Sequence, residues 1–144
     1  MSIASILRNK SPEVICVAPQ ATIGEVVRLL SQRRIGAVLV QDSAGQVLGI
    51  VSERDVVHGL ARHAADVLEM SAAQLMTRDL KTATIHTTEA EAMEMMTAGR
   101  FRHVPVMDGT RLVGMISIGD VVKARIQQTQ HEVESLKAYV AGAA

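Results

Sequence analysis

One stretch of this chain occurs twice, and the duplication limits the folds open to it. Residues 49–57 read GIVSERDVV and residues 114–122 read GMISIGDVV, so a Gly, a Ser, an Asp and two Val recur at one internal spacing. Self-similarity at a fixed period indicates a duplicated structural unit. At an offset of 66 residues, six upstream positions also match: Thr22, Glu25, Arg34, Val38, Val40 and Asp42 against Thr88, Glu91, Arg100, Val104, Val106 and Asp108.

Each copy predicts the order strand, helix, strand, strand, helix. VICV at residues 14–17 is a short run rich in β-forming residues. The apolar residues after it recur at i, i+3, i+4 and i+7, which is the spacing of one helical face. They are Ile23, Val26, Val27 and Leu30 in the first copy and Ala92, Met93 and Met96 in the second.

A hairpin follows each of these helices. AVLV (37–40) and VLGIV (47–51) are joined by a turn. In the second copy VPVM and RLVGMI flank Asp108-Gly109, a dipeptide that accepts the positive φ angles of a tight hairpin. Strands this continuously apolar are covered on both faces, and the helices on either side of each hairpin can supply the cover.

The size of the copies predicts one α/β body. Each copy has only about 50 residues, a size at which an isolated core is marginal, so the two should pack together. We place the first repeat with an N-terminal segment at residues 1–66, the second repeat at 67–126 and a C-terminal helical extension at 127–144. Residues 62–78 join the copies, and Ser71 predicts the cap of a short helix there. Ser2 to Leu7 precedes the first copy in a comparable way.

Composition argues against several classes of function. Lys plus Arg and Asp plus Glu number 15 each, and no long run of one charge could follow a nucleic-acid backbone. No apolar stretch approaches the roughly 20 residues of a membrane span, and the N-terminus does not resemble a signal peptide. The single Cys16 lies between apolar neighbours and fits a reducing compartment. We therefore expect a cytoplasmic protein that binds neither nucleic acid nor membranes.

The repeated Ser-x-x-Asp has two interpretations. As a variant capping box, Ser52 and Ser117 accept from the first free N–H groups of a helix, and Asp55 and Asp120 favour its positive end. As a binding site, the same junction presents amides, a hydroxyl and a carboxylate to one cleft, which suits a nucleotide. A carboxylate there can accept both hydroxyl hydrogens of a ribose, as in dinucleotide sites.

Taken together, the motifs resemble a known family, the tandem cystathionine β-synthase (CBS) domain or Bateman module. The resemblance covers about residues 2–126. It rests on VAPQATIGEVVRLLSQRRIGAVLV followed by GQVLGIVSERDVV, and on QLMTRDLKTATIHTTEAEAMEMM followed by RFRHVPVMDGTRLVGMISIGDVV. It implies two pseudo-symmetric β-α-β-β-α repeats with up to two clefts for adenosyl ligands such as AMP, ADP, ATP, S-adenosylmethionine or NAD(H).

The resemblance also implies ligand-binding residues. Asp55 and Asp120 match the family's ribose-binding positions, with Ser52 and Ser117 as the hydroxyls beside them. Arg102 and His103, just before Val104 and Pro105, match basic positions that approach phosphates, whereas the first copy has Gly36 and Ala37 there, so the two clefts should differ. Arg54 in the first motif stands opposite Gly119 in the second, where a Gly admits close backbone approach. Adenine would contact the first strands, with Ile15, Cys16 and Thr82 as candidates.

No residue pattern indicates catalysis or a resident metal. The five histidines form no recognisable ligand motif with cysteine or carboxylates. No nucleophile lies on a glycine-flanked elbow, and no glycine-rich phosphate loop occurs. We therefore predict no enzyme activity, no catalytic cofactor and no metal.

The C-terminal segment carries a heptad stripe. Its apolar and small residues are spaced 4, 3, 4, 3, 4, which is typical of a coiled-coil seam: Val122, Ile126, Thr129, Val133, Leu136 and Val140. A helix of about 20 residues spans roughly 30 Å, which would overrun so small a body, so we expect it to pack on another subunit. The alternative is a helix folded back on its own domain.

These observations predict a regulatory module. We expect a homodimer or higher oligomer, formed through the CBS faces and the C-terminal helix, that binds AMP as first choice and NAD(H) or ATP next. Such a module would sense energy or redox metabolites and signal through its dimer interface. The alternative is a structural adaptor with empty clefts, in which the Ser and Asp residues only cap helices.

Overall fold

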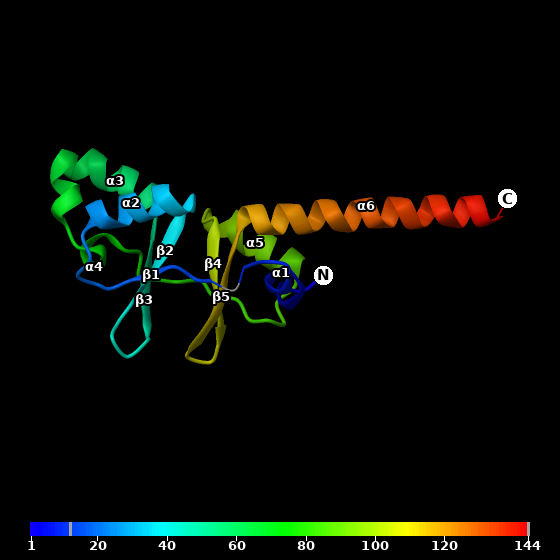
Figure 1. Ribbon diagram of the computed structural model, residues 1–144, viewed down its shortest axis with the longest axis horizontal. Coiled ribbons are helices and arrows are strands. Elements are labelled where there is room, and N and C mark those ends of the chain that lie inside the picture. Colours follow the sequence, from blue (N-terminus) through cyan, green and yellow to red (C-terminus); the bar gives the residue numbers. More distant parts are fainter. Residues whose placement is uncertain (12, 144) are drawn as a thin grey trace. The chain divides into compact units, whose positions relative to one another are not determined.

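The computed structural model describes residues 1–11 and 13–143, and the chain divides into two compact units (Figure 1). The first-repeat unit comprises Glu13–Leu80 with Gly109–Leu112. The second-repeat unit comprises Met1–Pro12, Lys81–Asp108 and Val113–Ala144. Neither unit is one continuous stretch of chain. Ala144, the last residue of the predicted extension, lies outside the described residues.

The first-repeat unit contains a three-stranded sheet in the order β1-β2-β3. β1 (Cys16–Val17) runs parallel to β2 (Ala37–Gln41), and β3 (Val47–Ser52) runs antiparallel to β2 with Ala37 opposite Ser52. The helical elements are α2 (Ile23–Arg33), α3 (Glu53–His63), the 3-10 helix η1 (Ala64–Glu69) and α4 (Ala72–Leu75). The predicted hairpin and helices are confirmed, but only two residues of VICV pair as a strand.

Local chemistry defines the ends of α2. Thr22 and Glu25 form a capping box in which each side chain accepts from the other's backbone N–H. The helix stops where Arg34 adopts the left-handed conformation, with φ of 53°. Three residues of its predicted apolar face are buried: Ile23, Val26 and Leu30. They join a core that includes Val38, Val40, Val51 and Val67.

The second-repeat unit repeats this arrangement. Its elements are α1 (Ile3–Arg8), α5 (Glu89–Gly99), the strand β4 (His103–Asp108), its partner strand β5 (Arg111–Ser117) from Val113 onward, and the long α6 (Ile118–Ala143). A single parallel bridge from Ala83 to Val106 takes the place of β1. Gly109, with φ of +61°, makes the predicted hairpin turn. The core includes Ile3, Ala92, Met96, Ile116 and Val121.

Each repeat is preceded by a short segment that belongs to the other repeat's unit. The N-terminal segment, which precedes the first repeat, belongs to the second-repeat unit, and the segment around Thr77, which precedes the second repeat, belongs to the first-repeat unit. Ser2 forms a bridge with Thr88, and the Ile3 N–H donates to the Thr87 carbonyl at 2.9 Å. In the first-repeat unit, Thr77 and Ile50 exchange two backbone hydrogen bonds of 2.8 and 3.0 Å. β3 therefore has a backbone partner on each of its edges.

Gly49 in β3 and Gly114 in β5 have no side chain that would block these preceding segments, so the segments can pack closely against the two strands. A Cβ added at Gly49 would lie 2.7 Å from the Thr77 carbonyl oxygen and 2.7 Å from Met76 Sδ. A Cβ added at Gly114 would lie 2.9 Å from a terminal methyl of Leu7. Both contacts are shorter than real Cβ contacts, but only the one at Gly49 involves backbone.

Gly49→Ala should therefore cost more stability than the matched Gly114→Ala. We expect Gly49→Ala to lower the free energy of unfolding by about 2–3 kcal/mol, because Thr77 cannot move without straining its two backbone hydrogen bonds. Gly114→Ala should cost about 1 kcal/mol or less, since the Leu7 side chain can change rotamer. Urea unfolding of both variants measures the difference, and equal losses would contradict this account.

Candidate functional site

The first repeated motif lies where β3 ends and α3 begins. The Ser52 N–H donates to Asp55 Oδ2 at 2.8 Å, and the Asp55 N–H donates to Ser52 Oγ at 3.3 Å. The Ser52 hydroxyl also donates to Asp55 Oδ2 at 3.0 Å. The capping box predicted from Ser-x-x-Asp is therefore present, and both side chains are partly buried.

The second motif has the same geometry between β5 and α6. The Ser117 N–H donates to Asp120 Oδ2 at 2.8 Å, and the Asp120 N–H donates to Ser117 Oγ at 3.2 Å. Gly119, between them, is exposed. The duplication is thus preserved in the hydrogen bonds as well as in the residue spacing.

Each motif lies next to the start of the neighbouring strand. The Glu53 N–H donates to the Gly36 carbonyl at 2.9 Å, and the Ile118 N–H donates to the Arg102 carbonyl at 2.8 Å. Most of the predicted site residues therefore gather in two equivalent places. One group comprises Gly36, Ala37, Ser52, Arg54 and Asp55. The other comprises Arg102, His103, Val104, Pro105, Ser117, Gly119 and Asp120. The candidates for adenine lie further along: Ile15 and Cys16 run beside β2, where Cys16 is paired with Leu39, and Thr82 precedes the bridge from Ala83 to Val106.

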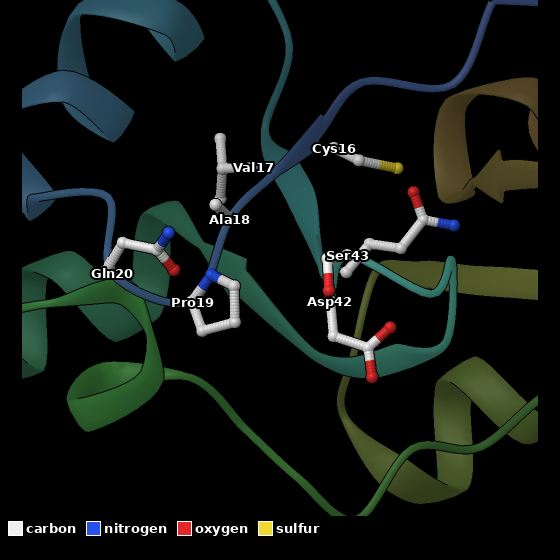
Figure 2. Close-up of a pocket in the computed structure, with 8 residues that line it drawn as sticks. Cys16, Val17, Ala18, Pro19, Gln20, Asp42 and Ser43 are labelled. Carbon is white, nitrogen blue, oxygen red and sulfur yellow. The ribbon is translucent and has the colours of Figure 1, made fainter.

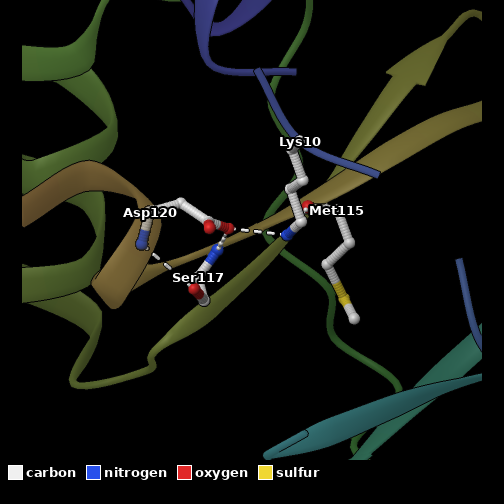
Figure 3. Close-up of polar contacts among 4 residues, drawn as sticks. All are labelled: Lys10, Met115, Ser117 and Asp120. Carbon is white, nitrogen blue, oxygen red and sulfur yellow. Dashed lines mark hydrogen bonds and ion pairs between the residues drawn. The ribbon is translucent and has the colours of Figure 1, made fainter. Parts of the chain in front are cut away.

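A third partner distinguishes the two carboxylates. Asp55 Oδ1 accepts from the Thr77 hydroxyl at 3.1 Å. Asp120 Oδ2 instead accepts from Lys10 Nζ at 2.6 Å, and the same ammonium donates to the Met115 carbonyl at 2.7 Å (Figure 3). The roles of Thr77 and Lys10 were not predicted from the sequence, because each lies far along the chain from the motif that it contacts.

The ammonium of Lys10 changes the acidity of Asp120. Partial burial by itself would raise the pKa of this carboxyl group. The hydrogen bonds from Lys10 and Ser117, together with the positive charge of Lys10, outweigh burial and hold the pKa below its ordinary value. The second motif therefore contains an ion pair between the Asp120 carboxylate and the Lys10 ammonium, whose charges offset each other.

The capping geometry leaves acceptor capacity on both carboxylates. A carboxylate offers two oxygens with about four lone-pair positions, and each cap uses mainly Oδ2. Asp55 Oδ1 has one protein donor, the Thr77 hydroxyl. Capping and acceptance of hydroxyl hydrogens from a ligand are therefore compatible at these positions.

Of the predicted ligand-binding residues, Cys16 alone lines the cavity that the described residues form away from the two motifs. A cavity of about 440 Å³ is lined by residues 16–20 and 41–43, at the end where β1 and β2 finish (Figure 2). Ser52 lies opposite Ala37, at the other end of β2. Four residues of strand span roughly 13 Å, so this cavity is separate from the Asp55 motif. Burial raises the pKa of the Cys16 thiol, which keeps it protonated and weakly reactive.

Among the described residues, no group of three or more His, Cys, Asp or Glu side chains could hold a metal ion. No helix within residues 1–11 or 13–143 is both long and apolar enough to cross a membrane.

Replacing Lys10 by Met should destabilise the protein in a pH-dependent way. The folded-state pKa of Asp120 lies below its unfolded value, so the stabilisation is present at neutral pH and is lost as the pH falls below about 3.9. We expect Lys10→Met to cost about 1 kcal/mol between pH 5 and 7, since the pair is partly exposed, and progressively less in acid.

A double-mutant cycle with Asp120→Asn provides the control. In that background, the pH-dependent part of the Lys10→Met effect should disappear, because the titrating partner is gone. Denaturant unfolding at pH 3, 5 and 7 gives the four free energies. A cost that stayed the same from pH 7 to pH 3 would show that Lys10 acts only through the Met115 carbonyl.

Comparison with known proteins places this geometry in a family. The family model described as CBS domain matches residues 4–62 and 72–127. The curated protein CBSX3, a mitochondrial CBS domain-containing protein of Arabidopsis thaliana, is 33% identical over 125 residues, which is 84% of this chain and 61% of that protein. The chain therefore spans less than two thirds of that relative's length.

Solved structures share the fold. The CBS-domain containing protein ATU1752 from Agrobacterium tumefaciens matches with a TM-score of 0.84 and 45% identity over 86% of this chain and 92% of that one. Two others were solved with ligands. The CBS domain pair of protein MJ0100, with 5-methylthioadenosine and S-adenosyl-L-methionine, has a TM-score of 0.78 and covers 89% of this chain and 98% of its own. CBSX2 with AMP has a TM-score of 0.75 and the same coverages.

Both ligand-bound structures are 22% identical to this chain, so they show the likeness of fold alone. The duplicated motif, the two equivalent strand-to-helix junctions and the family match agree with one another. The chain belongs to the CBS domain family and carries two CBS domains in tandem.

Proposed function

We propose that this protein is a regulatory module that binds an adenosyl ligand, with AMP as first choice and NAD(H) or ATP next. The observation that carries the proposal is the pair of equivalent junctions. In both repeats a strand end, a helix N-terminus and the start of a neighbouring strand place Ser, Asp and backbone amides together. Proteins of the same fold have been solved with AMP, methylthioadenosine and S-adenosylmethionine.

The chemistry of the junction suits the sugar of a nucleoside. A ribose presents two adjacent hydroxyl donors. Asp120 has lone-pair positions for both while it caps its helix, and Asp55 has them once the Ser52 or Thr77 hydroxyl turns away. The helix N-terminus adds a positive end that attracts a phosphate. Neither the carboxylate nor the helix N-terminus alone selects a nucleotide, but together they match its ribose and its phosphate.

The two sites should prefer different parts of a ligand. In the second repeat, Arg102 and His103 stand where the first has Gly36 and Ala37, and Lys10 adds a third basic group beside Asp120. The first repeat has Arg54 in its motif and a neutral Thr77 on its carboxylate. We therefore propose that the second repeat is the stronger phosphate site. Asp55, whose third partner is a neutral hydroxyl and not an ammonium, is the stronger acceptor for a ribose.

The module would act as a sensor and not as an enzyme. The described side chains at both junctions provide caps, hydrogen bonds and charge, and the family match covers most of the chain. Binding would report through the interface of a homodimer or higher oligomer. The size of any response is limited by the difference in the ligand's affinity for the two conformations.

One observation favours the alternative of a structural adaptor. Each carboxylate already has protein partners, because it caps its own helix and contacts Thr77 or Lys10. In that case the Ser and Asp residues would serve stability only, and no adenosyl compound would bind.

Thermal unfolding with AMP, NAD(H), ATP and S-adenosylmethionine separates these functions. A bound ligand at 100 times its dissociation constant should stabilise the fold by about 2.7 kcal/mol. Asp55→Asn and Asp120→Asn should each remove the part of the shift that arises at its own site, and the double variant should remove all of it.

Glu25→Gln is the matched control, since Glu25 completes a capping box on α2 outside both motifs. It should lower the unliganded stability by about 1 kcal/mol or less and leave the ligand shift intact. A ligand shift that survives in the double Asp variant would overturn the proposed role of the two carboxylates. The absence of any shift across the panel would favour the adaptor.

A further inference from the structure

Most of α6 has no cover within the chain. The first part of the helix is anchored, because Val121 is fully buried and Ala124 is 6% exposed. From residue 125 to residue 142 every residue is exposed except Gln128, which is partly buried. The uncovered part therefore extends for about 25 Å along the helix axis. Most helical stability in proteins comes from packing of an apolar face, so an uncovered helix of this length calls for a partner.

The uncovered part carries the heptad stripe on its surface. Leu136 is 63% exposed, Val140 60%, Ile126 53% and Val133 46%. With Ile126 assigned to position a, the β-branched residues Ile126, Val133 and Val140 all fall at a, and Leu136 falls at d. In parallel coiled coils, β-branched residues at a with Leu at d favour two strands. Thr129 occupies the other d position of this segment.

The flanking charges favour a parallel orientation. In this register Glu132 occupies position g and Lys137 the following e. In a parallel pair, g of one helix faces the following e of the other, so each Glu132 would face the Lys137 of the second copy, twice by symmetry. Within the described part of the chain, neither residue forms an ion pair, and Glu132 accepts one long hydrogen bond of 3.4 Å from Gln128.

We propose that residues 126–140 of α6 pair with the same segment of a second copy as a parallel two-stranded coiled coil. This deepens the dimer of the proposed function by naming its surface and direction, and it does not depend on a bound nucleotide. An antiparallel pair would place g against g and e against e, which would separate Glu132 from Lys137. A helix folded back on its own unit would bury the stripe without a second copy.

Cysteine cross-linking tests the orientation in the full chain. In a Cys16→Ala background, Val140→Cys places a thiol at position a, where a parallel pair brings it against its own counterpart. We expect mild oxidation to give a disulfide-linked dimer on a non-reducing gel. His131→Cys, at position f on the opposite side, should cross-link at least tenfold more slowly.

A mixture of the two single variants Thr129→Cys and Val140→Cys, one of them carrying an affinity tag, reports the antiparallel alternative, since these two positions face each other only in that arrangement. Preferential formation of the mixed cross-linked dimer over the Val140→Cys homodimer would overturn the proposal. A monomer in sedimentation at concentrations where the ligand panel is run would overturn it too. Neither result would bear on nucleotide binding, which the thermal shifts measure separately.

Charge reversal tests the Glu132–Lys137 pairing. Glu132→Lys should weaken the dimer roughly fivefold, because two attractive contacts become repulsive. Adding Lys137→Glu should restore the affinity, since the pairs re-form with reversed signs. Glu134→Lys, at position b, makes the same change in net charge and should alter the dissociation constant less than twofold. Equal effects of Glu132→Lys and Glu134→Lys would contradict the pairing.

Discussion

Both repeats depend on one kind of interaction, the capping box that turns a strand into a helix. A helix N-terminus leaves amides without partners, and a strand that runs directly into it must satisfy them within a few residues. Ser52 with Asp55 and Ser117 with Asp120 do so through pairs of reciprocal hydrogen bonds. Because the carboxylate must lie at this junction to cap, it is also held beside the start of the neighbouring strand.

Much of the fold was predictable, because it rests on local patterns. The duplication is visible in the sequence itself, and the hairpin at Asp108-Gly109 and the caps at Ser52, Ser71 and Ser117 are short-range signals; each is present in the structure. The four-residue strand VICV was wrong in extent, since only Cys16 and Val17 pair. The cause is tertiary, because a strand needs a partner along its length and the apolar pattern alone does not supply one.

The site was predictable only in part, for the same physical reason. The carboxylates and their caps lie three residues apart and follow from the motif, whereas the partners that distinguish them come from distant segments. Lys10 is 110 residues from Asp120, and Thr77 is 22 from Asp55. No periodicity or spacing in the sequence predicts such contacts. Each depends on a segment, that of Lys10 or that of Thr77, which precedes one repeat and packs in the unit of the other. The electrostatic difference between the motifs is therefore a property of the fold and not of either motif.

The packing of α1 in the second-repeat unit also has a consequence for folding during translation. Residues 13–80 contain the three-stranded sheet and the four helical elements of the first-repeat unit, so most of this unit can assemble soon after they leave the ribosome. α1 precedes them in the chain, yet its neighbours Thr87 and Gly114 come much later. The apolar side chains of Ile3 and Ile6 therefore reach their core partners, such as Ile116, only after most of the polypeptide has been made.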